Sequence, residues 1–137
     1  MQVAIVYIGQ NKELSEYSKY FSIKLSEKNH IPTFINGILE KPRMAFFHYV
    51  VFFIESPSFF KPNYIKELSD FFKEVGRINS RYCSLFVNKT FFSNKNLLKY
   101  MQKIENEGIV LHQSDVIANL EMAKQIADDF TPIKNGE

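Results

Sequence analysis

The sequence predicts a doubly wound α/β domain in which helices cover both faces of a five-stranded parallel sheet. Short apolar runs alternate along the chain with segments of helical periodicity about 12 residues long. The runs carry almost no charge, which is typical of strands buried on both faces. Such strands are joined by right-handed crossovers through helices. A length of 137 residues fits one domain, so we expect a single domain spanning residues 1–137.

Composition excludes several broad classes. Hydrophobic residues make up 45% and charged residues 23%, as in soluble globular proteins, which argues against a disordered, collagen-like or membrane-bundle protein. The net charge of +2 is too balanced to indicate a nucleic-acid binder. Cys83 is the only cysteine, so no intrachain disulfide forms. No secretory signal or run of ~20 apolar residues is present. We therefore expect a cytoplasmic protein with neither nucleic acid nor a membrane among its partners.

The first predicted unit is a strand followed by a helix. The strand is the apolar run from Val3 to Ile8, which ends at Gly9. Asn11 is the expected N-cap of the helix, and a helical stripe follows before the helix ends near His30. The stripe consists of Leu14, Tyr17, Phe21 and Leu25.

The middle of the chain contains the clearest strand. A short strand is expected at 32–37, and Pro42 argues against a continuous regular element across 38–47. Residues 49–54 are β-branched or aromatic throughout, which predicts a central strand. The turn signal Glu55-Ser56-Pro57 follows it.

The remaining elements repeat the same alternation. A helix over 63–75 has Leu68 at the centre of its apolar face. A strand at 82–87, a helix around 97–104, a strand at 109–111 and a helix over 120–130 complete the chain. We expect the sheet to bury five marker residues, which are Val6, Val51, Phe53, Phe86 and Val110.

One segment carries a resemblance to a known family. Tyr-Val-Val-Phe-Phe-Ile at 49–54 leads into Ser56-Pro57-Ser58-Phe59 and then a helix. This order resembles the third strand and following loop of flavodoxins and related FMN reductases. The resemblance implies a flavodoxin-like sheet with strand order 2-1-3-4-5 and FMN as cofactor. A response-regulator receiver shares that order but needs paired acidic residues where 7–10 read Tyr-Ile-Gly-Gln.

The resemblance also implies a site. Ligands of doubly wound sheets lie beyond the carboxyl ends of the strands, where strand order reverses. The loops after Ile8, Ile54 and Val87 meet there. The first loop is expected to hold the FMN phosphate, with Lys12 neutralising charge, and the Phe pairs of the other loops to stack on the flavin ring. The expected cofactor-binding residues are Gly9, Gln10, Asn11, Lys12, Ser15, Ser56, Pro57, Ser58, Phe59, Phe60, Asn88, Phe91 and Phe92.

Two departures from the family leave two functions open. Flavodoxins read approximately Ser/Thr-x-Thr-Gly-x-Thr in the first loop, whereas Ser15 offers the only hydroxyl between Gly9 and Ser15. Electron-transfer flavodoxins are strongly acidic, and this chain is slightly basic. One hypothesis is an FMN-binding redox protein of electron-transfer or flavin-reductase type, acting with a redox partner protein. The alternative is a flavodoxin-fold protein that has lost FMN and acts as a protein-interaction module.

No catalytic or metal-binding constellation emerges. His30, His48 and His112 show no metal-ligand spacing, and Cys83 falls inside a predicted strand. Lysines and aromatic residues alternate over 89–100, a pattern that can bind single strands. A solvated helix face beside a packed loop is the favoured interpretation. We predict no catalytic residue and no metal.

Overall fold

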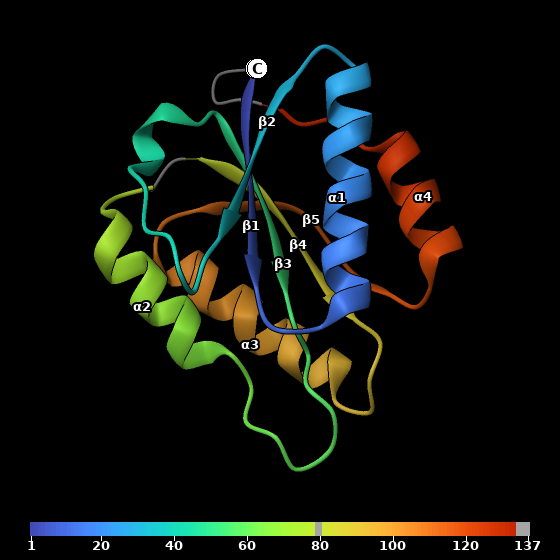
Figure 1. Cartoon of the computed structure of the whole chain (residues 1–137). Helices are drawn as coiled ribbons and strands as arrows, with labels where there is room; N and C mark the ends of the chain where they lie inside the picture. Colours follow the sequence, from blue (N-terminus) through green and yellow to red (C-terminus); the bar gives the residue numbers. More distant parts are fainter. Residues whose placement is uncertain (79–80, 134–137) are drawn as a thin grey trace.

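The computed structural model describes residues 1–78 and 81–133, so residues 79–80 and 134–137 of the predicted domain lie outside the described residues. Strands and helices alternate along the chain (Figure 1). They are β1 (Gln2–Ile8), α1 (Lys12–Glu27), β2 (Ile31–Asn36), the 3₁₀ turn η1 (Met44–Phe46), β3 (Tyr49–Ile54), α2 (Ile65–Val75), β4 (Tyr82–Asn88), α3 (Ser93–Asn106), β5 (Val110–Ile117) and α4 (Leu120–Asp129).

The five strands form one parallel sheet in the order β2-β1-β3-β4-β5. Helices α1 and α4 cover one face, and α2 and α3 cover the other (Figure 1). The predicted fold class and strand order are therefore confirmed. The reversal of strand order falls between β1 and β3, whose last residues Ile8 and Ile54 pair with each other.

Two apolar cores sandwich the sheet. One contains Leu68 and the rest of the α2 face, and the other contains Phe21 of α1. Every residue of β3 is buried, as expected of a central strand covered on both faces. Four of the five marker residues are fully inaccessible, but Val110 is 47% exposed. That prediction was wrong because β5 is an edge strand and Val110 is its first residue. The strand also extends well beyond the predicted 109–111.

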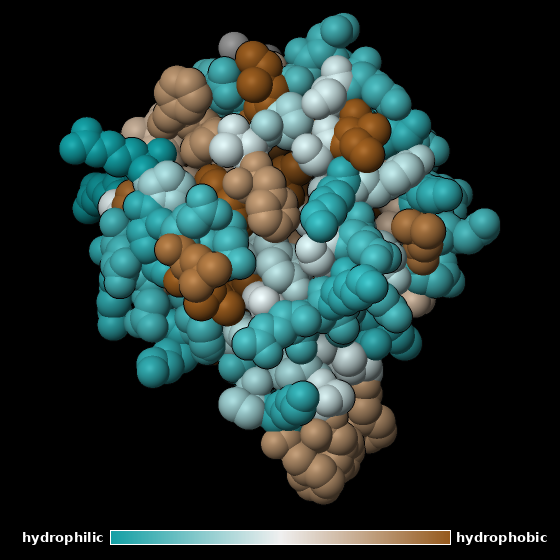
Figure 2. Space-filling view, viewed as in Figure 1, coloured by the Kyte–Doolittle hydropathy of each residue, from teal (hydrophilic) through white to brown (hydrophobic). Residues whose placement is uncertain are grey.

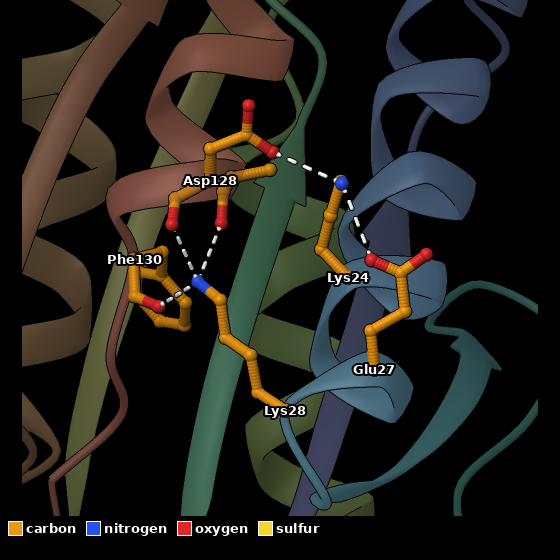
Figure 3. A network of polar contacts seen from close by, with 6 residues as sticks. Lys24, Glu27, Lys28, Asp128 and Phe130 are labelled. Atoms are coloured by element: carbon orange, nitrogen blue, oxygen red, sulfur yellow. Dashed lines mark hydrogen bonds and ion pairs between the residues drawn. The ribbon is translucent and has the colours of Figure 1, made fainter.

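Polar contacts of two lysines join the end of α4 to α1 (Figure 3). Lys28, just after α1, donates from its ammonium group to carbonyl oxygens at the end of α4, where the last turn of a helix leaves carbonyls short of intrahelical donors. Lys24 also pairs with Asp128 at 3.3 Å, an exposed ion pair of small energetic weight. The three acceptors of Lys28 are the carbonyls of Ala127 (3.0 Å), Asp128 (2.8 Å) and Phe130 (2.7 Å).

Among the described residues, no helix is both long enough and apolar enough to cross a bilayer.

Candidate functional site at the carboxyl edge

A cavity of about 390 Å³ opens at the carboxyl edge of the sheet, beside the switch point between β1 and β3. This is the position at which doubly wound folds bind ligands. Six predicted site residues line it, namely Gln10, Asn11, Lys12, Ser56, Ser58 and Asn88. Four further lining residues were missed by the sequence analysis, namely Glu55, Lys61, Tyr64 and Thr90.

The first loop is very short. Only residues 9–11 separate β1 from α1. Asn11 caps the helix as predicted, since its Oδ1 accepts a hydrogen bond from the Leu14 N–H at 2.8 Å. Ser15 already lies in α1, where its N–H donates to the Asn11 carbonyl at 3.1 Å, and it is absent from the cavity lining. The one hydroxyl of the predicted phosphate loop is therefore not presented to the cavity.

The Glu55 side chain lies against this loop and lines the cavity. Its Oε1 accepts a hydrogen bond of 2.6 Å from the Gln10 N–H. Gly9 permits the approach, because a Cβ at that residue would lie 2.5 Å from the Glu55 Cβ, and its φ of +153° also disfavours a side chain. In anion-binding loops the backbone N–H groups at this position donate to the ligand. Here the Gln10 N–H donates to the Glu55 carboxylate instead.

Glu55 also influences two neighbouring phenols. Burial, and then the negative charge of Glu55, raises the pKa of Tyr7 well above its ordinary value. The same two causes, in the same order, raise the pKa of Tyr64. Both hydroxyls therefore stay protonated, and a second anion placed beside Glu55 would meet the same unfavourable field.

The second loop is held by buried hydrogen bonds. The Ser56 N–H donates to Asn88 Oδ1 at 2.7 Å, and Asn88 Nδ2 donates back to the Ser56 carbonyl at 3.0 Å. The Ser56 hydroxyl lies 2.7 Å from Thr90 Oγ1 and accepts from Asn96 Nδ2 at 2.9 Å. Ser56 and Asn88, both predicted to contact FMN, are thus already bonded within the protein. This network instead supplies a rigid base for the loops above it.

The four predicted stacking residues do come together, in a cluster that we call the aromatic tip: Phe59, Phe60, Phe91 and Phe92. The rings of Phe59 and Phe92 are stacked, with centroids 5.5 Å apart and planes inclined by 29°. Phe91 meets Phe92 edge to face at 4.8 Å. A flat ring inserted between two others needs about 7 Å, which is twice the carbon–carbon contact distance. The rings therefore pack against one another and leave no slot for a flavin between the two loops.

Pro57, the remaining predicted residue of this loop, is buried and borders a smaller hollow beside Phe92.

These observations test whether the edge fits FMN. A phosphate dianion needs free N–H donors and hydroxyls, and the described loop offers a three-residue turn whose Gln10 N–H is bonded to a carboxylate. The isoalloxazine ring needs an open pair of flat side chains, and the stacked phenylalanines are closed. The residues present do not fit the group.

Other reactive side chains have structural environments. Burial raises the pKa of the Cys83 thiol, which is fully inaccessible. His112 Nδ1 lies 3.0 Å from the Tyr49 hydroxyl, which also bonds Ser84 inside the core. Within residues 1–78 and 81–133, no three His, Cys, Asp or Glu side chains are placed to hold a metal ion.

A five-stranded parallel sheet in this order, with a cavity at its switch point, defines the flavodoxin-like fold. Solved flavodoxin structures superimpose on the chain over nearly its whole length. Two-electron reduced flavodoxin of Megasphaera elsdenii matches with a TM-score of 0.76 and 10% identity, covering 92% of this chain and 96% of that one. Oxidised flavodoxin 1 of Bacillus cereus gives 0.70 and 9%, with 93% and 92% covered. The Streptococcus pneumonia TIGR4 flavodoxin gives 0.69 and 11%, with 94% and 97% covered.

No protein-family model matches the chain, and no curated protein matches it significantly. The likeness to solved structures therefore establishes the fold, and function has to be argued from the carboxyl edge itself.

Proposed function

We propose that this chain is a flavodoxin-fold protein that works without tightly bound FMN, as an interaction module that uses its carboxyl edge. The observation that carries the proposal is the 2.6 Å hydrogen bond from the Gln10 N–H to the Glu55 carboxylate. It places a fixed negative charge where the phosphate of a flavin cofactor would need a donor. The chain itself thus occupies a donor that a ligand phosphate would otherwise use.

The rest of the edge supports the same proposal. Ser56 and Asn88 have their polar groups bonded within the protein, so they are structural supports rather than free ligand contacts. The rings of the aromatic tip do not line the cavity, and Phe59, Phe60 and Phe91 are exposed to solvent. Exposed aromatic clusters on soluble domains are typical of interaction surfaces.

An FMN-binding redox protein is the second candidate. It is favoured by the 390 Å³ cavity at the switch point, which has Lys12 and Lys61 in its lining. Two ammonium groups provide a favourable field for a phosphate. FMN would supply the electron or hydride transfer, and the slightly basic chain would deliver electrons to a redox partner protein. This candidate requires the Glu55 side chain and the phenylalanine rings to move apart.

Titration with FMN separates the two candidates. We expect the purified protein to show no absorption band near ~450 nm. We also expect it to leave the fluorescence of added FMN unquenched at micromolar concentrations. Riboflavin, which lacks the phosphate, is the matched ligand control. Stoichiometric quenching by FMN with submicromolar affinity would overturn the proposal and establish the redox candidate.

A further inference from the structure

The aromatic tip is the most exposed apolar feature of the edge. Phe60 is 93% exposed, Phe91 81% and Phe59 51%. In Figure 2 the tip forms a tan projection at the lower end of the molecule, where Figure 1 places the loop before α2. These rings contact one another but not the two apolar cores of the domain, and an exposed apolar patch of this kind is costly in water. It therefore calls for a function outside the chain's own core.

The backbone holds this projection at a cost. Phe60 has a φ of +68°, a left-handed conformation that bulky residues rarely adopt. The adjoining turn is closed by the Lys61 N–H, which donates to the Ser58 carbonyl at 3.3 Å. Its base is anchored by the buried hydrogen bonds of Ser56. Strain of this kind persists when the surrounding structure over-determines it, and it concentrates at functional sites.

Positive charge surrounds the tip. The sequence has no Asp or Glu between residues 56 and 66 or between 82 and 104. Lys61, Lys95 and Lys99 line a hollow of about 150 Å³ next to Phe92. Lys89 is exposed on the second tip loop. Within the described residues, none of these four lysines forms an ion pair. The near-neutral chain thus concentrates unpaired cations around its apolar projection.

We propose that the aromatic tip docks this protein on an anionic membrane surface. Phe60 and Phe91 enter the boundary between headgroups and acyl chains, and the surrounding lysines contact lipid phosphates. The hollow between Lys61, Lys95 and Lys99 receives one headgroup phosphate. This goes beyond the proposed function, because it names a surface and a kind of partner. It departs from the expectation of no membrane partner, which rested on the absence of a spanning segment.

The shape and chemistry of the tip favour lipid over other partners. Protein hot spots are enriched in Trp, Tyr and Arg, and the tip contains only Phe with surrounding Lys. Single-stranded nucleic acid is bound along a positively charged groove that follows its backbone, whereas the tip is a projection on which Phe60 is 93% exposed. A convex apolar projection with a basic rim is complementary to a negatively charged, deformable interface.

Cosedimentation of the full chain with vesicles tests the proposal. Vesicles of phosphatidylcholine alone are compared with vesicles that also contain phosphatidylglycerol. We expect binding to the anionic vesicles only, weakening as salt is raised, because the surface potential decays within a Debye length. The double variant Phe60→Ser/Phe91→Ser should bind at least about tenfold more weakly. Its matched control is Phe46→Ser, which removes a 65% exposed aromatic ring from η1 at the opposite edge of the sheet.

Charge is tested with a second matched pair. Lys61→Glu/Lys95→Glu should lose binding to anionic vesicles, whereas Lys19→Glu/Lys73→Glu, with the same net charge, should keep most of it. Absence of binding to anionic vesicles at low salt overturns the proposal. An equal loss of vesicle binding in the Phe46→Ser control also overturns it. So does tip-dependent binding to an oligothymidylate, or to a second copy of this chain, in place of binding to lipid. FMN titration of the same preparation tests the proposed function independently of the vesicle assay. Vesicle binding can therefore fail while FMN binding is still absent, and FMN can bind while vesicle binding is still observed.

Discussion

Neutralising Glu55 is expected to create anion affinity at the carboxyl edge. Two variants separate its charge from its hydrogen bond. Glu55→Gln keeps an acceptor for the Gln10 N–H and removes the negative charge, whereas Glu55→Ala removes both. If the carboxylate stands in for a phosphate, affinity for FMN or inorganic phosphate should rise from wild type to Gln to Ala.

The size of the effect follows from the geometry. A phosphate bonded to the Gln10 N–H would lie in contact with the Glu55 oxygen that is now 2.6 Å from the same nitrogen. Two unit charges 4 Å apart repel by about 1 kcal/mol in water and about 4 kcal/mol at an effective dielectric of about 20. Glu55 is half-buried, so roughly 1–2 kcal/mol per phosphate charge applies, which corresponds to a gain in affinity of about tenfold or more.

The free energy of unfolding should fall in the same variants whose affinity for phosphate rises. A hydrogen bond to a charged group contributes about 1.5–3 kcal/mol when buried, and partial exposure lowers that figure. We expect Glu55→Ala to reduce the free energy of unfolding by about 1–2 kcal/mol and Glu55→Gln to reduce it by less.

Fluorescence titration with FMN, calorimetry with phosphate and urea denaturation measure these changes. Glu13→Gln is the control, because it removes an exposed carboxylate from the first turn of α1 that does not line the cavity. Unchanged phosphate and FMN affinity in both Glu55 variants, with the stability loss present, would refute the role of Glu55 as an internal anion. An equal gain from Glu13→Gln would show a general charge effect instead.

Four further tests, three with variants and one with a thiol reagent, examine the packing of the fold. Leu68→Ala should cost about 2–5 kcal/mol in urea denaturation, because this side chain is fully buried in the α2 core. Asn88→Ala should cost about 2–4 kcal/mol by the same measurement, since it leaves the buried N–H and carbonyl of Ser56 without partners. Cys83 should react with a thiol reagent only after unfolding, because burial both covers the thiol and raises its pKa; fast reaction of the native protein contradicts this. Lys28→Met should lower stability by about 1–2 kcal/mol through the three carbonyls at the end of α4, and an unchanged melting curve would refute it.

The fold could be predicted because its main elements depend on local patterns. Residues 49–54 are apolar throughout, and such a run is stable only when both of its faces are covered. The apolar stripe around Leu68 likewise has one orientation that buries it. Strand order followed from the resemblance carried by Ser56-Pro57-Ser58-Phe59. Val110 was misjudged because its exposure depends on its place at the start of an edge strand, which the local sequence does not reveal.

The predicted loops do meet beside a cavity at the carboxyl edge, but the contacts that Glu55 makes there could not be predicted. The sequence indicates Glu55 only as part of a turn signal, because its contact with Gln10 depends on the parallel register that brings Ile8 beside Ile54. The absence of hydroxyls between Gly9 and Asn11 was the available signal. It indicated a poor phosphate loop without indicating what replaces the phosphate. A glycine directly after β1 is also ambiguous, and here it admits the neighbouring carboxylate.

The carboxyl edge of a doubly wound sheet leaves some backbone groups without partners in the strands or helices. Where β1 turns into α1, backbone N–H groups point outward and need acceptors. A ligand anion is one solution, and it makes the stability of the loop depend on the ligand's concentration. Here the Asn11 side chain accepts from the Leu14 N–H and Glu55 accepts from the Gln10 N–H, so two of these groups are bonded without a ligand. Internal acceptors of this kind make the loop depend less on a bound anion, which accords with the proposed use of this edge to present the aromatic tip.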